Sequence, residues 1–268
     1  KILIVDNNPV IRRMLSSALE KEQFQVECAE DGLSAFDCLD SFVPDIIFLD
    51  LIMPNINGEQ FCQMIFGRKG LEHTKIVVIS GVAVEAGNES EIQGVHACIA
   101  KGPHLVNHVL DVARKITNVD FHQTGIHQVF GVDHLFPREI SKELLAANRH
   151  LKVVLHNMSE GIVELSADHR IIFANPAAAK LAGMAQERLL ACDFTQFFSD
   201  SDQQRVMELL QHNNALPQQI TDNDPVMFNR LQVAINFLPV TDRENSTVVV
   251  IIKDISKTKI AEERLRET

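Results

Sequence analysis

Tryptophan and tyrosine are absent from this sequence, so phenylalanine, with 15 residues, supplies all of its large aromatic side chains. A large planar cofactor would therefore have only phenylalanine rings to stack against. Positive charge is also scarce, because 25 Lys and Arg residues face 36 Asp and Glu residues, a formal net charge of -11. Nucleic-acid binding depends on clustered Lys and Arg that neutralise phosphates, and this composition argues against it.

Paired cysteines and long apolar runs are absent as well. The five cysteines are odd in number and scattered, with no C-x-x-C spacing. This pattern is typical of reduced thiols, and we expect a cytoplasmic protein. No apolar run is long enough to cross a bilayer and no signal peptide is visible, so no membrane segment is expected. The chain lacks an initiating Met and stops within the helical pattern KIAEERLRET, so we expect a fragment of a longer protein.

What is present suffices for two domains, since the chain has 268 residues of which 46% are hydrophobic. In the first half, apolar runs alternate with helical patterns, which is typical of βαβ units in a doubly wound parallel sheet. Asn8 and Pro9 form a start signal for the first helix. The expected strands are Ile2–Val5, Phe24–Cys28, Ile46–Leu49, Ile76–Ile79 and Ala97–Ala100. The expected helices are Val10–Leu19, Leu33–Leu39, Gln60–Phe66 and Leu105–Ile116, with a weaker pattern over Val82–Gln93.

Reactive side chains follow several of these strands. Asp6 ends ILIVD and Asp50 ends DIIFLD, two strands that are apolar throughout, as strands buried on both faces are. Ligands of such sheets bind outside the carboxyl ends of the strands, where two carboxylates can hold a divalent cation. The fourth strand ends on Ser80, and Lys101 follows the fifth. An acid pair, a hydroxyl and an ammonium at one edge suit phosphoryl transfer to a carboxylate, with Asp50 as the nucleophile.

Residues 1–118 resemble the receiver domain of two-component response regulators. The resemblance is carried by ILIVDNNPVIRRML, AEDGLSAF, PDIIFLDLIMPNINGEQF, IVVISG and CIAKGP, in family order and with family spacing. It implies an α/β flavodoxin-like fold with five parallel strands in the order 2-1-3-4-5. It also implies that Asp50 is the phosphoacceptor, that Ser80 and Lys101 contact the phosphoryl group, and that Mg²⁺ is the cofactor. The carbonyl of Ile52 would help to bind that metal.

The predicted metal site departs from the receiver pattern at one position. The family has two adjacent acids after the first strand, and the second, a direct metal ligand in the family, is Asn7 here. The implied metal ligands are therefore Asp6, Asn7, Asp50 and Ile52. An amide oxygen can bind Mg²⁺ but brings no charge, so we expect weaker binding.

The second departure is at Cys98, where the family usually has an aromatic residue that swings inward on phosphorylation. That switch is not expected to operate here, and Gly102 before a proline alters the following loop. A degenerate receiver that only scaffolds other proteins is the alternative. Because Asp50, Ser80 and Lys101 are all retained, we favour a receiver that can be phosphorylated.

The segment 119–136 has no clear periodicity and is expected to be a linker. It contains His122, His127 and His134, three residues that could suggest a metal site. Their spacing fits no known ligand frame, so a solvated linker remains the interpretation.

A connecting helix or coiled coil is expected over residues 137–158, beginning at Pro137. Its apolar residues step by four and three, the a/d spacing that buries a narrow seam. The seam residues are Ile140, Leu144, Ala147, Leu151, Val154 and Met158. We favour a parallel homodimer through residues 140–158, and packing of the helix on its own domain is the alternative.

From residue 159 to residue 256 the order changes to strands, short helices and strands, typical of α+β with an antiparallel sheet. The expected elements are strands in GIVEL and RIIFAN, helices Ala177–Ala182 and Ser201–Leu210, and strands Arg230–Pro239 and Thr247–Lys253. NMSEGIVELSADHRIIFANPAAAKLAGM together with VVVIIKDISKTKIAEERLRE resembles a PAS domain, which senses a ligand or mediates dimerisation. The resemblance implies that Asp254 and Ser256 couple the sheet to an outgoing helix, residues 257–268.

The PAS ligand is not identified by the sequence. Cys192 lies in LLACDFTQFF, which lacks the cysteine motif of photoreactive flavin domains. A haem would need an axial histidine, and His212 is expected to be an ordinary surface residue. We expect a pocket that is empty or holds a small molecule of unknown identity.

These interpretations predict two-component signal transduction by a receiver coupled through a helix to a PAS sensor, as part of a hybrid sensor histidine kinase. The fragment itself would receive phosphate at Asp50 from a histidine kinase or a histidine phosphotransfer protein. The change of charge would then bias the helical seam between the modules. The alternatives are the regulatory part of a diguanylate cyclase, which the sequence beyond Thr268 would identify, and a non-enzymatic adaptor.

Overall fold

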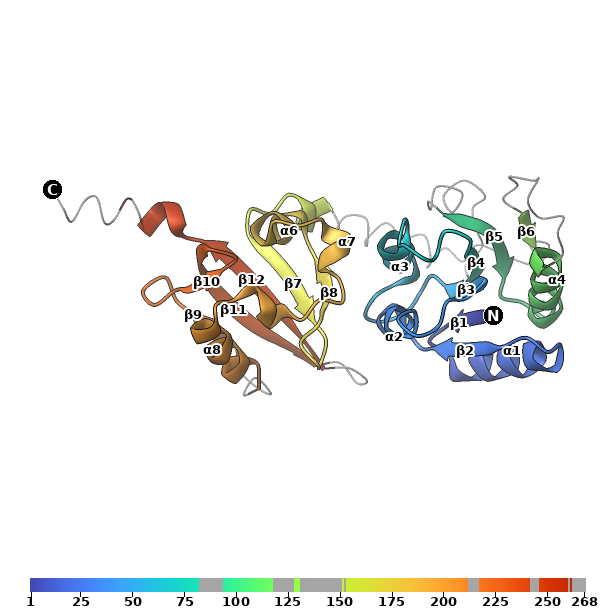
Figure 1. Cartoon of the computed structure of the whole chain (residues 1–268). Helices are drawn as coiled ribbons and strands as arrows, with labels where there is room; N and C mark the ends of the chain where they lie inside the picture. The colour runs from blue at the N-terminus through green and yellow to red at the C-terminus, as the bar shows by residue number, and fades with distance from the viewer. Residues whose placement is uncertain are drawn as a thin grey trace. The chain divides into compact units, whose positions relative to one another are not determined.

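The computed structural model describes residues 1–81, 94–117, 128–130, 151, 153–211, 217–241, 246–259 and 261. The chain divides into two compact units, Lys1–Ala146 and Ala147–Thr268, and each is described by itself. Figure 1 colours the first unit from blue to green and the second from yellow to red. Several predictions concern residues outside the described ones: the weak pattern over Val82–Gln93, the predicted linker except residues 128–130, the connecting helix over 137–150, and residues 260 and 262–268 of the outgoing helix. The histidines His122, His127, His134 and His212 also lie outside the described residues.

The first unit contains a parallel sheet in the order β2-β1-β3-β4-β5-β6. Its strands are β1 (Ile2–Val5), β2 (Val26–Ala29), β3 (Ile46–Asp50), β4 (Lys75–Ser80), β5 (Val95–Ala100) and β6 (Gln128–Phe130). The first five have the predicted order 2-1-3-4-5, which confirms the flavodoxin-like fold. Every residue of β1 and β3 is buried, which explains why their sequences are apolar without alternation.

Helices cover both faces of this sheet (Figure 1). They are α1 (Pro9–Lys21), α2 (Gly32–Cys38), α3 (Gly58–Ile65) and α4 (Leu105–Thr117). Leu15 and Leu19 of α1 pack with Val109 and Val112 of α4 in one core cluster against β1, β3, β4 and β5. The start signal of α1 is confirmed, because Asn8 Oδ1 accepts a hydrogen bond from the backbone N–H of Val10 at 2.9 Å.

The sixth strand, β6, was not expected, because it lies within the segment 119–136 that the sequence predicts as a linker. Its backbone pairs in parallel with β5, with Ala97 opposite Gln128 and Cys98 opposite Val129. Without β6, the backbone groups on the outer side of β5 would form an open sheet edge. Three residues of sequence QVF, two of them strand-forming types, satisfy part of that edge.

The second unit contains an antiparallel sheet in the order β10-β11-β12-β7-β8, with β9 pairing to β11. The strands are β7 (Gly161–Leu165), β8 (Ile171–Ala174), β9 (Gln218–Ile220), β10 (Val226–Phe228), β11 (Leu231–Thr241) and β12 (Ser246–Asp254). The helices are α6 (Pro176–Ala182), α7 (Gln186–Leu189), the 3-10 helix η4 (Phe194–Phe197) and α8 (Asp200–Gln211). The predicted α+β fold is confirmed, and the short elements α7, η4, β9 and β10 were not predicted.

One buried amide joins three parts of the second unit. Asn175, which is 1% exposed, accepts hydrogen bonds at Oδ1 from the N–H groups of Ile162 and Ala178, both at 2.9 Å. Its Nδ2 donates to the carbonyls of Leu155 at 3.1 Å and Glu160 at 3.0 Å. The chain entering the unit, strand β7 and helix α6 are therefore held by a single side chain.

The exit from the second unit is also hydrogen-bonded. Asp254 Oδ1 accepts from the N–H of Ser256 at 2.9 Å, and Ser256 Oγ accepts from the N–H of Gln232 at 3.0 Å. Residues 256–259 are helical. Asp254 and Ser256 thus connect β12 and β11 to the start of a helix, and signal coupling through them stays a prediction. Within the described part of the chain, no helix has the length and apolar character needed to span a bilayer.

Candidate functional site

The carboxyl ends of the parallel strands bring two acids and one lysine together. Val5 of β1 pairs with Leu49 of β3, so Asp6 and Asp50 leave the sheet side by side. Lys101 directly follows β5, and its Nζ lies 2.6 Å from Asp50 Oδ2 and 2.8 Å from Asp6 Oδ2. One ammonium group therefore bridges two carboxylates that are 44 residues apart in the sequence.

This acid pocket, defined as Asp6, Asp50 and Lys101, is well removed from water. The side chains of Asp6 and Asp50 are 1% and 6% exposed, and that of Lys101 is 20% exposed. Burying a carboxylate is costly unless a positive charge and hydrogen bonds compensate. With a single ammonium for two carboxylates, the pocket keeps a formal charge of about -1 when all three groups are ionised.

The pKa values in the pocket show how burial and charge oppose each other. Burial raises the pKa of Asp50, and although the hydrogen bond and charge of Lys101 lower it, the net direction is upward. For Lys101, burial lowers the pKa, but the hydrogen bond to Asp50 and the charges of Asp50 and Asp6 outweigh burial and raise the pKa. Lys101 is therefore held in its charged form, and Asp50 binds a proton more readily than an exposed aspartate does.

The oxygen atoms of the pocket suit a hard divalent cation. Asp6 Oδ1 accepts from the N–H of Asn8 at 2.8 Å, and Asp50 Oδ1 accepts from the N–H of Ile52 at 3.2 Å. Asp6 Oδ2 is buried and, among the described residues, receives only the ion contact with Lys101 and no well-directed hydrogen bond. This oxygen can therefore accept a further ligand.

The described residues contain no cluster of three His, Cys, Asp or Glu side chains that could hold a metal. A cation here would use the carboxylates of Asp6 and Asp50 with carbonyl, amide and water oxygens. Mg²⁺ is commonly held in this way, through one or two carboxylates while keeping several waters. The donor atoms that are present thus fit Mg²⁺.

The other residues singled out in the sequence lie on or just after strands β1, β3, β4 and β5. Ser80 is buried at the end of β4, and its carbonyl accepts from the N–H of Lys101 at 2.7 Å. Ile52 lies in the loop between β3 and α3, with an exposed side chain and its N–H bonded to Asp50. Asn7 is exposed in the turn after β1. Cys98 is buried in β5, opposite Val78 of β4. The individual roles of these residues stay predictions.

Gly58 is a site residue that the sequence reasoning missed. A Cβ atom at this position would lie 2.3 Å from the carbonyl oxygen of Asp50 and 2.8 Å from the Cα of Leu51. Helix α3 can begin this close to Asp50 only because Gly58 has no side chain. The residue stands in the quoted motif NINGEQF, but sequence spacing does not reveal which backbone it approaches.

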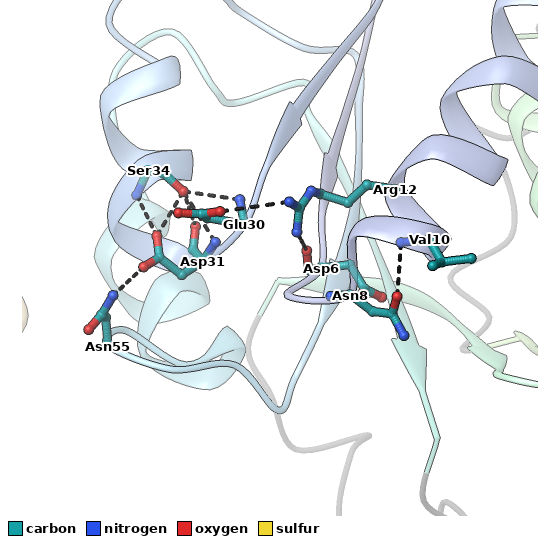
Figure 2. A network of polar contacts seen from close by, with 8 residues as sticks. All are labelled: Asp6, Asn8, Val10, Arg12, Glu30, Asp31, Ser34 and Asn55. Atoms are coloured by element: carbon teal, nitrogen blue, oxygen red, sulfur yellow. Dashed lines mark hydrogen bonds and ion pairs between the residues drawn. The ribbon is translucent and has the colours of Figure 1, made fainter. Parts of the chain in front are cut away.

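Arg12 is a second residue that was not singled out. Its guanidinium donates to the carbonyl of Asp6 at 2.7 Å and lies 3.7 Å from the carboxylate of Glu30 (Figure 2). This hydrogen bond therefore holds the backbone of Asp6, the residue that follows β1. The motif VIRRML contains two adjacent arginines, and only the tertiary structure distinguishes the one that faces the pocket.

Comparisons with known proteins agree with these two folds. Residues 2–109 match the family model of the response regulator receiver domain, and residues 155–260 match the family model of the PAS fold. Sensor histidine kinase TmoS of Ectopseudomonas mendocina is 25% identical over 290 residues, covering 100% of this chain and 29% of TmoS. Protein PilG of Pseudomonas aeruginosa is 31% identical over 80 residues, covering 30% of this chain and 59% of PilG.

Among solved structures, the chemotaxis response regulator CheY4 of Vibrio cholerae is similar to part of the chain. The sequence identity is 25% and the TM-score 0.40, covering 43% of this chain and 96% of CheY4. This chain thus spans less than a third of TmoS and about three fifths of PilG.

Proposed function

Because the chain carries a receiver domain followed by a PAS domain, we propose that Asp50 accepts a phosphoryl group in a two-component signalling pathway. Receiver domains generally bind Mg²⁺ and interact with histidine kinases or phosphotransfer proteins. The observation that carries the proposal is the bridge from Lys101 to Asp50 and Asp6, at 2.6 and 2.8 Å, at the carboxyl edge of a parallel sheet.

In the proposed reaction, a carboxylate oxygen of Asp50 attacks the phosphorus of a phosphohistidine on the partner protein. A P–O bond forms while the P–N bond breaks, and the imidazole, protonated beforehand on its other nitrogen, leaves as a neutral ring. Before the transfer, Lys101 lowers the pKa of Asp50 against the opposing effect of burial, and after it Lys101 offers its ammonium to the phosphoryl oxygens. Ser80 donates its hydroxyl to one of these oxygens.

The proposed ligands of Mg²⁺ are Asp6, Asp50 and the carbonyl of Ile52. Asn7 is the fourth, at the position where receiver domains have a second acid. When bound, Mg²⁺ neutralises charge on the phosphoryl oxygens. Asn7 contributes an uncharged amide where the family has an acid, so the proposal includes weaker Mg²⁺ binding than two adjacent acids would provide.

The test is labelling of the protein by phosphoramidate or acetyl phosphate with Mg²⁺, followed by intact-mass measurement. We expect one phosphoryl group on the native chain and none on Asp50→Asn. The matched control is Asp45→Asn, which removes an exposed acid that pairs with the amino terminus at 2.6 Å and should leave labelling unchanged. A native chain that stays unlabelled, or labelling that persists in Asp50→Asn, would overturn the proposal in favour of a non-enzymatic adaptor.

We also propose that the longer protein is a cytoplasmic hybrid sensor histidine kinase. The support is TmoS, a sensor histidine kinase that is similar along the whole of this chain. The described cysteines are all free thiols, as expected in a reducing compartment. A C-terminal continuation with the sequence of a diguanylate cyclase would contradict this proposal.

A parallel homodimer through residues 140–158 is the proposed assembly. In the described part of this segment, residues 151 and 153–156 are helical, and the seam residues Leu151 and Val154 are 61% and 53% exposed. Apolar side chains at a/d spacing that stay exposed in one chain suit a second helix. We expect Leu151→Cys, at a seam position, to form a disulfide between two chains. Lys152→Cys, at the neighbouring position outside the seam, is the comparison and should crosslink less. Equal crosslinking at both positions would contradict the seam.

A further inference from the structure

The turn formed by Glu30 and Asp31, between β2 and α2, connects to the two chain segments that carry the carboxylates of the acid pocket. On one side, Glu30 lies 3.7 Å from Arg12, which donates to the carbonyl of Asp6 at 2.7 Å. On the other side, Asp31 accepts a hydrogen bond from Asn55 in the loop between β3 and α3. Figure 2 shows that these polar contacts are continuous. We call them the 30–31 brace, which comprises Arg12, Glu30, Ser34, Asp31 and Asn55.

Asp31 is a buried carboxylate with both oxygens engaged. It is 6% exposed, and its Oδ1 accepts from the backbone N–H and from the hydroxyl of Ser34, both at 2.7 Å. Its Oδ2 accepts from Asn55 Nδ2. The same side chain therefore caps α2 and holds the β3–α3 loop, and hydrogen bonds to a charged carboxylate are stronger than those between neutral groups.

Asn55 is the part of the loop that the brace holds. Its φ is +57°, a left-handed conformation that asparagine tolerates better than most residues. The neighbouring Ile56 accepts at its carbonyl from the N–H of Gly32 at 3.0 Å. A Cβ atom on Gly32 would lie 2.5 Å from that carbonyl oxygen, so the two loops approach each other at van der Waals limits. Two adjacent contacts thus fix the loop.

The loop matters because it contains Ile52. The N–H of Ile52 donates to Asp50 at 3.2 Å, and its carbonyl is a proposed cation ligand. If the loop moved, the N–H and the carbonyl of Ile52 would be displaced relative to Asp6. The backbone of Asp6 is itself held by the hydrogen bond from Arg12.

We propose that Asp31 and Asn55 are positioning residues, which hold the β3–α3 loop so that the cation ligands of the acid pocket keep their separation. This rests on the proposed function of Asp50. Neither residue touches the reacting atoms. Residues that orient metal ligands typically change metal affinity by about 10- to 100-fold when replaced.

The experiment uses the whole chain and compares Asn55→Gly, Asn55→Asp and the double exchange Asp31→Asn with Asn55→Asp. Asn55→Gly removes the amide without adding charge, and glycine accepts the positive φ. Asn55→Asp places two carboxylates in contact. In the double exchange, the asparagine at position 31 keeps an acceptor for Ser34 and offers its amide to the new carboxylate. Asn229→Asp is the matched control, since Asn229 also has a positive φ, of +45°, but donates to Leu181 in the second unit.

The readouts are the dissociation constant for Mn²⁺, measured from free Mn²⁺ by electron paramagnetic resonance, and the rate of labelling by phosphoramidate at limiting and saturating Mg²⁺. We expect Asn55→Gly and Asn55→Asp to weaken Mn²⁺ binding by about tenfold or more. The loss in labelling rate should be larger at limiting than at saturating Mg²⁺. The double exchange should recover most of the affinity, and Asn229→Asp should match the native chain.

The proposal is overturned if Asn55→Gly binds Mn²⁺ as tightly as the native chain, or if the double exchange binds as weakly as Asn55→Asp alone. Failure of the proposed function would look different, because the native chain would then remain unlabelled. The Mn²⁺ titration still decides the role of the brace in that case.

Discussion

Lys101 is the ammonium partner of both buried carboxylates in the acid pocket, and replacing it by methionine isolates the effect of its charge on stability. Lys101→Met keeps most of the side-chain volume but leaves the buried carboxylates of Asp6 and Asp50 without their ammonium partner. Their mutual repulsion and desolvation then oppose folding. We expect the free energy of unfolding of the first unit to fall at neutral pH.

The magnitude follows from burial. Removing one partner of a buried ion pair typically costs about 3–5 kcal/mol. The Lys101 side chain is 20% exposed, so water screens part of the interaction, and we expect a loss near the lower end, about 3 kcal/mol. The loss should shrink at acid pH, because the variant lacks the hydrogen bond and charge that lower the pKa of Asp50, and the carboxyl then protonates more readily.

Amide hydrogen exchange of β3 and β5 in the whole chain measures this loss separately from the second unit. The control is Arg114→Met, which breaks a contact at 2.9 Å with Glu22 between side chains that are 50% and 38% exposed, and should change little. Adding Asp50→Asn to Lys101→Met should restore part of the stability. Equal exchange in Lys101→Met and Arg114→Met, or no recovery in the double variant, would refute the reasoning.

Three further predictions concern single side chains. The pKa of Asp50 is raised by burial, so its contribution to stability is lost as pH rises through that pKa. Asp50→Asn should therefore increase stability at neutral pH and remove this loss of stability with rising pH in urea unfolding. Gly58→Ala places a Cβ against the carbonyl of Asp50, and it should lower the free energy of unfolding by about 1–3 kcal/mol and slow phosphoryl labelling. In the control Gly102→Ala, the added Cβ meets no atom, and both quantities should stay close to those of the native chain. Asn175→Ala removes the hydrogen-bond partner of two buried N–H groups and two carbonyls, and it should lower the free energy of unfolding by about 3 kcal/mol, measured by thermal unfolding. The control is Asn236→Ala, because Asn236 is exposed.

The controls decide how these results are interpreted. Gly58→Ala and Gly102→Ala with equal stability would show that the close approach at Gly58 relaxes without cost. An equal pH dependence of stability in the native chain and in Asp50→Asn would contradict the raised pKa of Asp50. Unfolding of Asn175→Ala at the native temperature would mean that water replaces the four hydrogen bonds.

Much of the first unit could be predicted from local sequence. Strands β1 and β3 were located to within one residue, because strands buried on both faces leave an uninterrupted apolar run. The edge strand β2 was expected to begin at Phe24 but begins at Val26, since its partly exposed residues give a weaker pattern. The start of α1 was readable because a cap and a proline act within a few residues of each other.

The grouping of Asp6, Asp50 and Lys101 was also predictable, because parallel strands carry whatever follows them to one edge. The linker, the dimer seam and the individual roles of Ser80, Asn7 and Ile52 remain predictions. Strand β6 was not foreseeable, since three residues of QVF form a strand only when β5 offers an open edge beside them.

By itself, then, the sequence determined which residues end each buried strand, and therefore which charges meet at the edge of the parallel sheet. It did so because hydrophobic periodicity and strand polarity are local properties of the chain. Only the tertiary structure decided that Asp31 holds Asn55, that Gly58 lies against the carbonyl of Asp50, and that Asn175 joins three segments of the second unit. These contacts connect residues whose separation in the sequence carries no periodic signal, and they exist only once the chain has packed.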